Sequence, residues 1–381
     1  MRAMSASVVL VTGVSRYLGS RLAARLAADP AIARVIGVDT VAPGREQTTL
    51  LGRTEFVRAD IRNPLIAKVI AAADVDTVVH VNITATPRGA GGRTSMKEMN
   101  VIGTMQLLAA CQKSASVRRL VVKSTTAVYG SSPRDPAMFT EEMEPKGLPR
   151  SGYAKDAVEV EGYVRGFGRR RPDVALTVLR FTNFIGPRID TPLTRYFGLR
   201  VVPTVFGYDP RIQLLHEDDA LEVLRLAATE DRPGIVNVGG SGALLLSQAL
   251  RRAGRLSVPV GPPAVHLVGR AARRAGLVDY SPEQLRLLEF GRVVDTTRLR
   301  KDFGYTPRYT TGEAFADFVR SRGLGPAIDP EAIDRAGQTA LRLLRRAGQV
   351  GGALTGRPAA PPVLARPGPG PGAGVEDDRR A

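Results

Sequence analysis

A turn rich in glycine near the N-terminus has the residue types that bind a phosphate group. Gly13 and Gly19 bracket it, in the stretch Val-Thr-Gly-Val-Ser-Arg-Tyr-Leu-Gly. Glycines there let the backbone approach a pyrophosphate, and a helix that starts at the turn offers free N–H groups. Asp39 follows about twenty residues later, where a carboxylate accepts hydrogen bonds from ribose hydroxyls. The spacing predicts a dinucleotide-binding site.

Alternating strands and helices are expected to position this turn. β-branched and apolar runs predict strands at 8–11, 34–38, 55–57, 77–80 and 119–122, and a helical period predicts helices at 18–28, 65–73 and 96–113. Fully apolar strands that alternate with helices are typical of a parallel sheet covered on both faces. We therefore predict an α/β fold, a doubly wound Rossmann sheet.

The chain changes character after residue 186. Segments punctuated by Pro and Gly follow, with shorter helices expected at 220–229 and 244–253. We predict a Rossmann dinucleotide-binding domain over 5–186 and a smaller substrate-binding lobe over 187–325, parts of which return to the Rossmann core. A basic helical segment is expected at 326–348, and a disordered tail rich in Pro, Gly and Ala at 349–381.

Composition limits the possible partners. The net charge is +17, but the excess is mostly Arg spread along the chain, without a dense basic run interleaved with aromatics, so no nucleic-acid partner is expected. The single cysteine, Cys111, suggests a reducing compartment, and we expect a cytoplasmic protein. The sequence has no uninterrupted run of about 18 apolar residues, so no membrane-spanning helix is expected. Arg342, Arg345 and Arg346 leave open recruitment to an acidic surface.

No metal site is expected. His80 and His216 lie in segments where packing or hydrogen bonding explains a histidine. His266 has no acidic or histidine neighbour at ligand spacing.

The motifs and their order resemble the extended short-chain dehydrogenase/reductase family, the NAD-dependent epimerase/dehydratase group. The resemblance covers nearly the first 310 residues. Its segments are Ala59-Asp60-Ile61-Arg62, His80-Val81-Asn82-Ile83, Asn100-Val101-Ile102-Gly103-Thr104, Ser124 to Gly130, Arg180 to Pro187, His216 to Asp219 and Asp295 to Pro307.

The resemblance implies a set of cofactor-binding residues. They are Gly13, Ser15, Arg16, Tyr17, Leu18, Gly19, Asp39, Asp60, Ile61, Val81, Asn82, Ile83, Asn100 and Ser124. The family's central turn glycine is Arg16 here, which suits the 2′-phosphate of NADP, whereas Asp39 suits NAD. NAD is the expected cofactor and NADP is the alternative.

The family's catalytic residues are only partly present. The resemblance assigns the catalytic hydroxyl to Thr125 and the proton-transferring phenol to Tyr153, but the family's lysine four residues on is Ala157. A phenol with a pKa of about 10 needs a nearby cation to act as a base near neutrality. Lys155 lies two residues from Tyr153, so on a helix it faces away. Loss of the cation costs on the order of 100- to 10,000-fold if it equals the loss of acid–base assistance.

Two functions therefore stay open. In the first, another cation such as Arg88, Arg180 or Arg188 reaches the site, and the chain is an epimerase/dehydratase-type oxidoreductase. In the second, the chain binds the dinucleotide without turnover, as a sensor or scaffold.

The expected substrate is a nucleotide sugar, in a reaction like that of a UDP-sugar 4-epimerase with transient hydride transfer. Its diphosphate requires Arg or Lys from the second lobe, where Arg188, Arg195, Arg200 and Arg211 are available. We predict Asn183, Arg188 and Arg211 as substrate-binding residues. The apolar stretch 201–206 leaves a steroid or small hydroxy-carbonyl substrate open. The resemblance also implies a possible homodimer through two helices, the one before the Ser124 strand and the Tyr153 helix.

Overall fold

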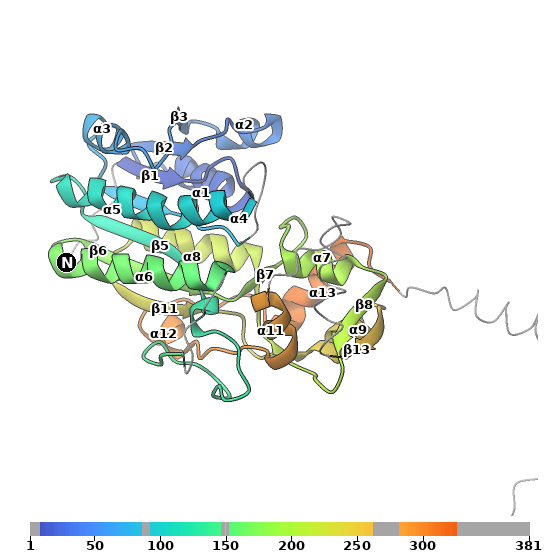
Figure 1. Ribbon diagram of the computed structural model, residues 1–381. Helices are drawn as coiled ribbons and strands as arrows, with labels where there is room; N and C mark the ends of the chain where they lie inside the picture. The colour runs from blue at the N-terminus through green and yellow to red at the C-terminus, as the bar shows by residue number, and fades with distance from the viewer. Residues whose placement is uncertain (1–7, 86–91, 146–148, 150–151, 262–281, 326–381) are drawn as a thin grey trace, which may run out of the picture. The chain divides into compact units, whose positions relative to one another are not determined.

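A parallel sheet of seven strands organises the chain (Figure 1). The computed structural model describes residues 8–85, 92–145, 149, 152–261 and 282–325. The sheet order is β11-β6-β5-β4-β1-β2-β3. Its strands are β1 (Val8–Thr12), β2 (Arg34–Asp39), β3 (Glu55–Arg58), β4 (Thr77–His80), β5 (Arg119–Thr125), β6 (Ala175–Phe181) and β11 (Gly234–Val238). The predicted doubly wound α/β fold is confirmed.

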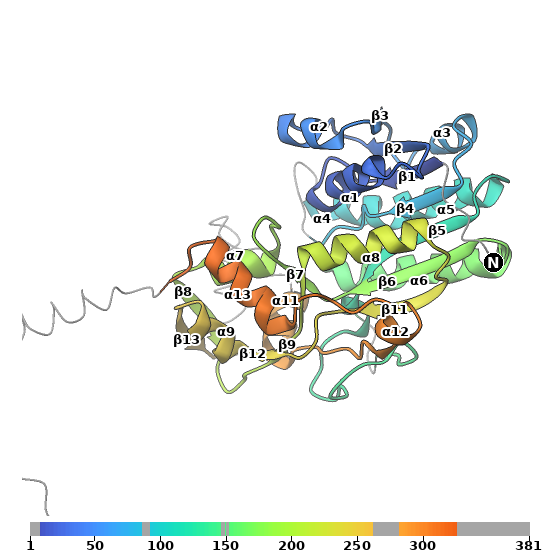
Figure 2. The same ribbon diagram turned by 180° about the vertical axis from the view of Figure 1, so that it is seen from behind.

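Helices cover both faces of this sheet because its strands are apolar on both sides. They are α1 (Tyr17–Ala28), α2 (Arg45–Leu51), α3 (Ile66–Ala72), α4 (Gly92–Lys97), α5 (Gly103–Lys113), α6 (Gly152–Arg170), α8 (Glu217–Thr229) and α12 (Thr297–Lys301). Odd residues of β1, such as Val9, pack with α1 and α8, whereas Leu10 packs with α3, α5 and α6. Figure 1 shows α5 and α6 over the near face, and Figure 2 shows α8 over the opposite one.

β1 lies between β2 and β4, which places a topological switch point at its carboxyl end. Open α/β sheets bind ligands in the crevice beside such a point. The predicted glycine turn, residues 13–19, starts there. The fold therefore brings the turn to the edge of the sheet where β5 also ends.

A second cluster of elements follows β6 and has its own apolar core. It consists of β7 (Asn183–Ile185), α7 (Pro192–Gly198), β8 (Val201–Val205), β9 (Arg211–Ile212), β10 (Leu214–His216), β12 (Leu244–Leu245), α9 (Leu246–Arg252), β13 (Leu256–Val260), α11 (Pro282–Phe290) and α13 (Thr311–Ser321). Phe197, Phe315 and Phe318 pack edge-on or tilted at its centre. β11, α8 and α12 come from the same stretch of chain but belong to the large sheet and its cover.

Some predicted elements have other limits in the structure. The single helix expected at 96–113 is α4, a π-helical turn over Glu98–Ile102, and α5. The side chain of Asn100, within that turn, bonds both backbone groups of Thr84, which fixes the irregular segment against the loop after β4. The helix expected at 244–253 starts later, because Leu244 and Leu245 pair with β9.

Several predictions fall on residues outside the described ranges. They are Arg88, His266, the segment 326–348 with Arg342, Arg345 and Arg346, and the tail 349–381. Within the described residues, no helix combines the length and apolar character needed to cross a bilayer.

Candidate cofactor and catalytic site

The glycine turn packs too closely for any larger residue. Gly13 has φ +78°, and a Cβ on it would lie 3.2 Å from Asn82. A Cβ on Gly19 would lie only 2.2 Å from the carbonyl oxygen of Gly13, so the turn folds directly onto the first turn of α1. Asp39 fixes the turn from β2, because its Oδ2 accepts the backbone N–H of Ser15 at 3.1 Å.

These residues fit a dinucleotide. Arg16 is the N-cap of α1 and its side chain makes no capping hydrogen bond, so the helix start offers unsatisfied N–H groups. The Oδ1 atom of Asn82 is buried against Gly13 without a hydrogen-bond partner in the structure. A polar ligand that lies along the turn would supply hydrogen bonds to both.

His80 supports the turn from the end of β4 as a neutral side chain. Its Nδ1 lies 2.8 Å from Thr12 Oγ1 and its Nε2 lies 2.9 Å from Thr104 Oγ1. The Thr104 hydroxyl donates to the carbonyl of Asn100, so it can only accept from Nε2, and Nδ1 then accepts from Thr12. Burial lowers the pKa of His80 to about 3, with Lys123 adding to the effect. The histidine is a structural residue, as expected.

A cavity of about 320 Å³ opens beside the turn. Twelve predicted site residues line it: Gly13, Arg16, Tyr17, Leu18, Gly19, Val81, Ile83, Ser124, Thr125, Tyr153, Asn183 and Arg188. The turn, the end of β5 and the start of α6 thus face one space, together with residues of the second cluster such as Tyr196 and Leu287.

Seven predicted site residues lie outside that lining: Ser15, Asp39, Asp60, Ile61, Asn82, Asn100 and Arg211. Asp60 pairs with Arg62 at 2.7 Å, and this hydrogen-bonded arginine lowers the pKa of the carboxyl group. Ile61 is buried against Gly103. The guanidinium of Arg211 donates to the carbonyl oxygen of Ala137 at 2.8 Å.

Thr125 and Tyr153 form the pair of hydroxyl groups that the motifs predict. Both residues line the cavity. Burial raises the pKa of the Tyr153 phenol to about 12, while the Thr125 hydrogen bond and the charge of Arg292 lower it. The phenol is therefore protonated near neutrality and is a proton donor.

The missing lysine leaves an apolar contact in its place. Ala157 is 1% exposed and packs with Val128, Tyr129, Phe139 and Val294. Lys155 is exposed and lies 3.8 Å from Glu159, as helix geometry predicts.

The two described candidates for a replacement cation differ in placement. Arg180 is buried and forms an ion pair with Glu161 at 2.7 Å, with a further hydrogen bond to Tyr129. Its guanidinium is thus paired with these residues, and Arg180 is not part of the cavity lining. Arg188 lines the cavity and its side chain is exposed.

Arg292 is a cation that the sequence did not single out. It lines the cavity, its Nη1 donates to the carbonyl oxygen of Gly130 at 3.1 Å, and its Nε is buried without a hydrogen-bond partner in the structure. Burial lowers its pKa to about 10, opposed by Asp135 and Tyr153. It remains charged at neutral pH, so it provides Tyr153 with a cation. An isolated parallel β-bridge between Ile212 and Arg292 brings Arg292 to the cavity. No local sequence motif predicts this pairing.

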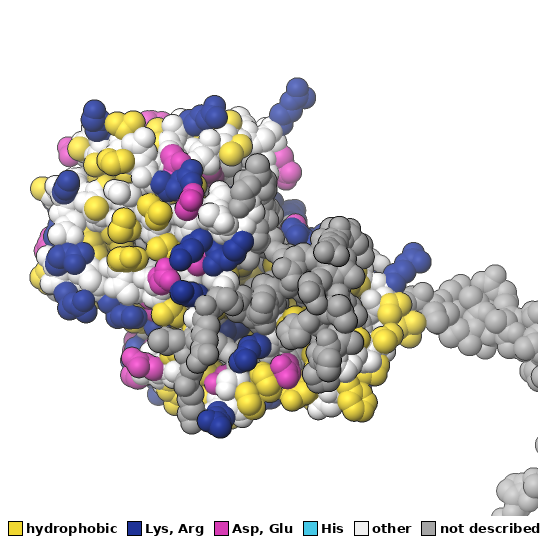
Figure 3. Space-filling model, viewed as in Figure 1, with side chains coloured by type: hydrophobic (Ala, Val, Ile, Leu, Met, Phe, Trp, Pro, Cys, Tyr) yellow, Lys and Arg dark blue, Asp and Glu magenta, His cyan; other side chains and the backbone are white. Residues whose placement is uncertain are grey.

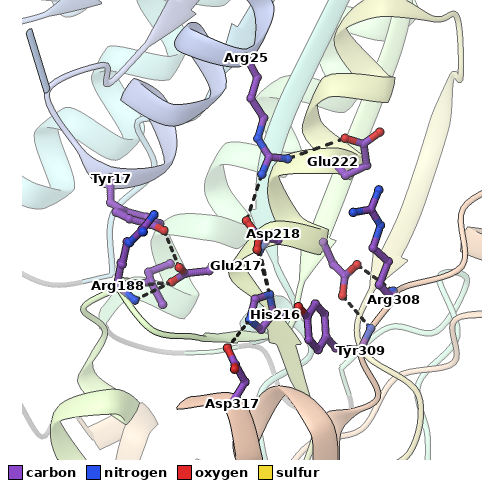
Figure 4. A network of polar contacts seen from close by, with 12 residues as sticks. Tyr17, Arg25, Arg188, His216, Glu217, Asp218, Glu222, Arg308, Tyr309 and Asp317 are labelled. Atoms are coloured by element: carbon purple, nitrogen blue, oxygen red, sulfur yellow. Dashed lines mark hydrogen bonds and ion pairs between the residues drawn. The ribbon is translucent and has the colours of Figure 1, made fainter. Parts of the chain in front are cut away.

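A buried carboxylate ties the turn to the second cluster (Figure 4). Tyr17 donates its hydroxyl to Glu217 Oε1 at 2.6 Å, and Glu217 Oε2 accepts the backbone N–H groups of Arg188 and Ile189. Glu217 is 3% exposed, and a Cβ on Gly186 would lie 2.7 Å from its carboxyl group. The start of α1 and the loop after β7 are thus held by one side chain.

His216 has a structural role beside this pair. Its Nδ1 accepts the N–H of Asp218 as the N-cap of α8, its Nε2 lies 3.2 Å from Asp317, and its ring stacks on Tyr309 at 3.9 Å. Figure 4 shows the imidazole enclosed by these partners.

Comparison with known proteins agrees with this geometry. The model of the NAD dependent epimerase/dehydratase family matches residues 9–239. The chain belongs to the NAD-dependent epimerase/dehydratase family. An uncharacterized protein of Mycobacterium tuberculosis is 53% identical over 326 residues, 86% of this chain and 87% of its own length.

One further relative and one structural neighbour have named activities. A UDP-glucose 4-epimerase of Yersinia pestis is 30% identical over 186 residues, which are 47% of this chain and 53% of that protein. The structure of a UDP-glucuronic acid 4-epimerase from Bacillus cereus, in complex with UDP-glucuronic acid and NAD, has a TM-score of 0.63 at 19% identity and covers 84% of this chain and 100% of its own. Membership of the NAD-dependent epimerase/dehydratase family identifies NAD as the cofactor.

Proposed function

We propose that this chain is an oxidoreductase of the epimerase/dehydratase type that acts on a nucleotide sugar, in a reaction like that of a UDP-sugar 4-epimerase. The observation that carries the proposal is that Thr125 and Tyr153 line the same cavity as the glycine turn. A proton donor is thereby placed where a bound dinucleotide would meet a substrate.

The chain's own groups have distinct roles in this proposal. NAD, when bound, accepts and returns a hydride. Tyr153 holds the proton that moves to or from the substrate oxygen, and Thr125 orients the phenol. Arg292 stabilises the tyrosinate that forms when this proton leaves, in place of the lysine absent at Ala157. The Tyr17–Glu217 contact holds the turn while this happens.

Cationic side chains of the cavity favour an anionic substrate. Arg188 and Arg292 line it, and Asn183 adds an amide. The planar guanidinium group of arginine donates paired hydrogen bonds that match the oxygen atoms of a diphosphate. The relative and the structural neighbour with named activities act on or bind UDP-sugars, which supports the same substrate class.

The test is turnover of UDP-glucose or UDP-galactose by the purified protein with NAD. Tyr153→Phe is expected to reduce the rate by about 100- to 10,000-fold, because the proton donor is lost while cofactor binding stays. Tyr208→Phe is the matched control, since this tyrosine is 41% exposed and does not line the cavity. Absence of turnover with any nucleotide sugar, in wild-type protein that binds NAD, would exclude the proposal.

The second candidate function is a dinucleotide-binding sensor or scaffold without turnover. The apolar contact at Ala157 is the observation that favours it. It predicts that a strain with Tyr153→Phe and Thr125→Ala keeps the chain's cellular function. Loss of that function in the double variant would contradict it.

We also propose a homodimer in a reducing compartment such as the cytoplasm. Exposed apolar side chains lie on α6 and at the start of α5, namely Ile102, Met105 and Tyr163 (42%, 38% and 43% exposed). Hydrophobic side chains gather over these helices in the left half of Figure 3. Analytical ultracentrifugation of wild type and Met105→Glu tests this, with a monomer expected for the variant only.

A further inference from the structure

A lysine on β5 carries a charge inside the cofactor cavity. Lys123 is 8% exposed, and its ammonium donates to the carbonyl oxygen of Ile83 at 2.7 Å. The nitrogen also lies 6.0 Å from the centroid of the Phe184 ring. Its side chain lines the same cavity as Tyr153 and the glycine turn.

This ammonium lacks the partners that a buried charge normally has. It has three donors, and the hydrogen bond to Ile83 uses one of them. Among the residues that the structure describes, no carboxylate lies within ion-pair distance of it. A buried cation without an anion is costly, so its retention points to a role in the site.

Lys123 is charged under physiological conditions. Burial lowers its pKa to about 8, with the positive charge of Arg16 contributing. The ammonium form therefore predominates at pH 7. Arg16 and Arg292 line the same cavity, so the local field is positive.

The strand geometry places this charge next to the reacting groups. Residues two apart on a strand point to the same face, so Lys123 and Thr125 project from one side of β5. Both line the cavity, which Tyr153 lines as well. In the proposed function, the nicotinamide must lie within hydride-transfer distance of a substrate held by Thr125 and Tyr153.

We propose that Lys123 makes the protein bind the reduced dinucleotide more tightly than the oxidised one. The oxidised nicotinamide ring carries a positive charge that the reduced ring lacks, so a nearby ammonium disfavours only the oxidised form. This inference rests on the proposed function, since it requires the dinucleotide to occupy the cavity.

The preference also bears on the hydride transfer. An ammonium that raises the free energy of the oxidised ring relative to the reduced ring would make bound NAD⁺ a stronger hydride acceptor, so it would favour oxidation of a substrate hydroxyl to a keto group. In that half-reaction NAD⁺ would take the hydride from the carbinol carbon, and the hydroxyl proton would pass to the tyrosinate form of Tyr153, which Arg292 stabilises. Return of the hydride and the proton to the keto group completes the redox-neutral reaction of the proposed function.

The experiment compares dissociation constants for NAD⁺ and NADH at pH 7 by calorimetry, on full-length protein. Wild type is expected to bind NADH at least about tenfold more tightly. Lys123→Met should reduce that ratio about tenfold, chiefly by improving NAD⁺ binding, whereas Lys123→Arg should keep it. Lys155→Met, which removes an exposed lysine, is the control and should leave the ratio unchanged.

Each outcome decides a separate question. A wild-type ratio near one, or a ratio unaltered in Lys123→Met, overturns the role of Lys123 but leaves the proposed function standing. Equal weakening of both nucleotides in Lys123→Met shows a structural role and also overturns it. If neither nucleotide binds wild type at millimolar concentration, the proposed function itself fails. If Lys123→Met does not fold, the wild-type ratio and Lys123→Gln decide.

Discussion

The two walls of the cavity are built in different ways. The wall at the glycine turn is backbone in close contact, with the side chain of His80 fully hydrogen bonded beneath it. The opposite wall carries the polar side chain of Tyr153 and two cations with unused hydrogen-bonding capacity, Lys123 and Arg292. In the proposed function, cofactor binding depends on backbone shape and the chemistry depends on charge, which can come from several elements. A cation from another element then takes the place of the lysine absent from the tyrosine helix.

The largest effect is expected at the rigid wall. Gly19→Ala places a methyl group 2.2 Å from a backbone oxygen, so the turn must move away from α1. We expect NAD affinity to fall by about 100-fold or more, measured by calorimetry. Gly162→Ala on α6 is the control, because nothing lies within 4 Å of its added Cβ. Equal NAD affinity in the two variants would show that the turn can accommodate the added methyl group and would contradict this prediction.

A smaller and different effect is expected at the charged wall. Arg292→Met removes the cation near Tyr153, so the pKa of the phenol rises further above its ordinary value. The rate kcat should fall by about 10- to 100-fold, and the basic side of the pH profile should move to higher pH.

The control for Arg292→Met is to measure NAD affinity separately from kcat. NAD affinity should stay within about twofold of wild type in Arg292→Met, and Arg292→Lys should recover part of the rate. A variant with normal kcat and an unmoved pH profile would mean that Arg188 or another group supplies the charge.

The last effect concerns the stability of the rigid wall in acid. His80 has a folded pKa of about 3 against an ordinary value of about 6.5, so the unfolded chain takes up the proton first. The stabilising contribution of neutral His80 is complete above pH 6.5. It is lost by about 1.4 kcal/mol for each pH unit as the pH falls toward 3.

Chemical unfolding at several pH values measures this slope. Wild type and His80→Gln are compared, so that the carboxylates, common to both, cancel. A steeper acid loss is expected for wild type. Parallel curves would mean that the pKa of His80 is the same in the folded and the unfolded chain.

The glycine turn and Thr125 could be predicted from the sequence, whereas the cations of the opposite wall could not. Gly13, Gly19 and Thr125 lie in contiguous motifs, whose strand-to-turn context fixes their place in an α/β sheet. Arg292 reaches the cavity through a bridge to Ile212, and such pairings between distant segments leave no local pattern. Lys123 lies just beyond the predicted end of its strand, and the facing direction of its side chain depends on a register that β6 and β4 decide. The partnership of Tyr17 with Glu217 also joins residues far apart in the chain.

The return of β11 to the edge of the large sheet has an evolutionary and practical consequence. The chain leaves that sheet after β6, comes back to it as β11, and comes back again as α12, whose Leu299 is buried in the same core. The substrate-facing part is thus interleaved with the cofactor-binding part. It cannot be swapped between relatives as a single cassette, and a chimera with new specificity needs several splice points that leave the β6–β11 pairing intact.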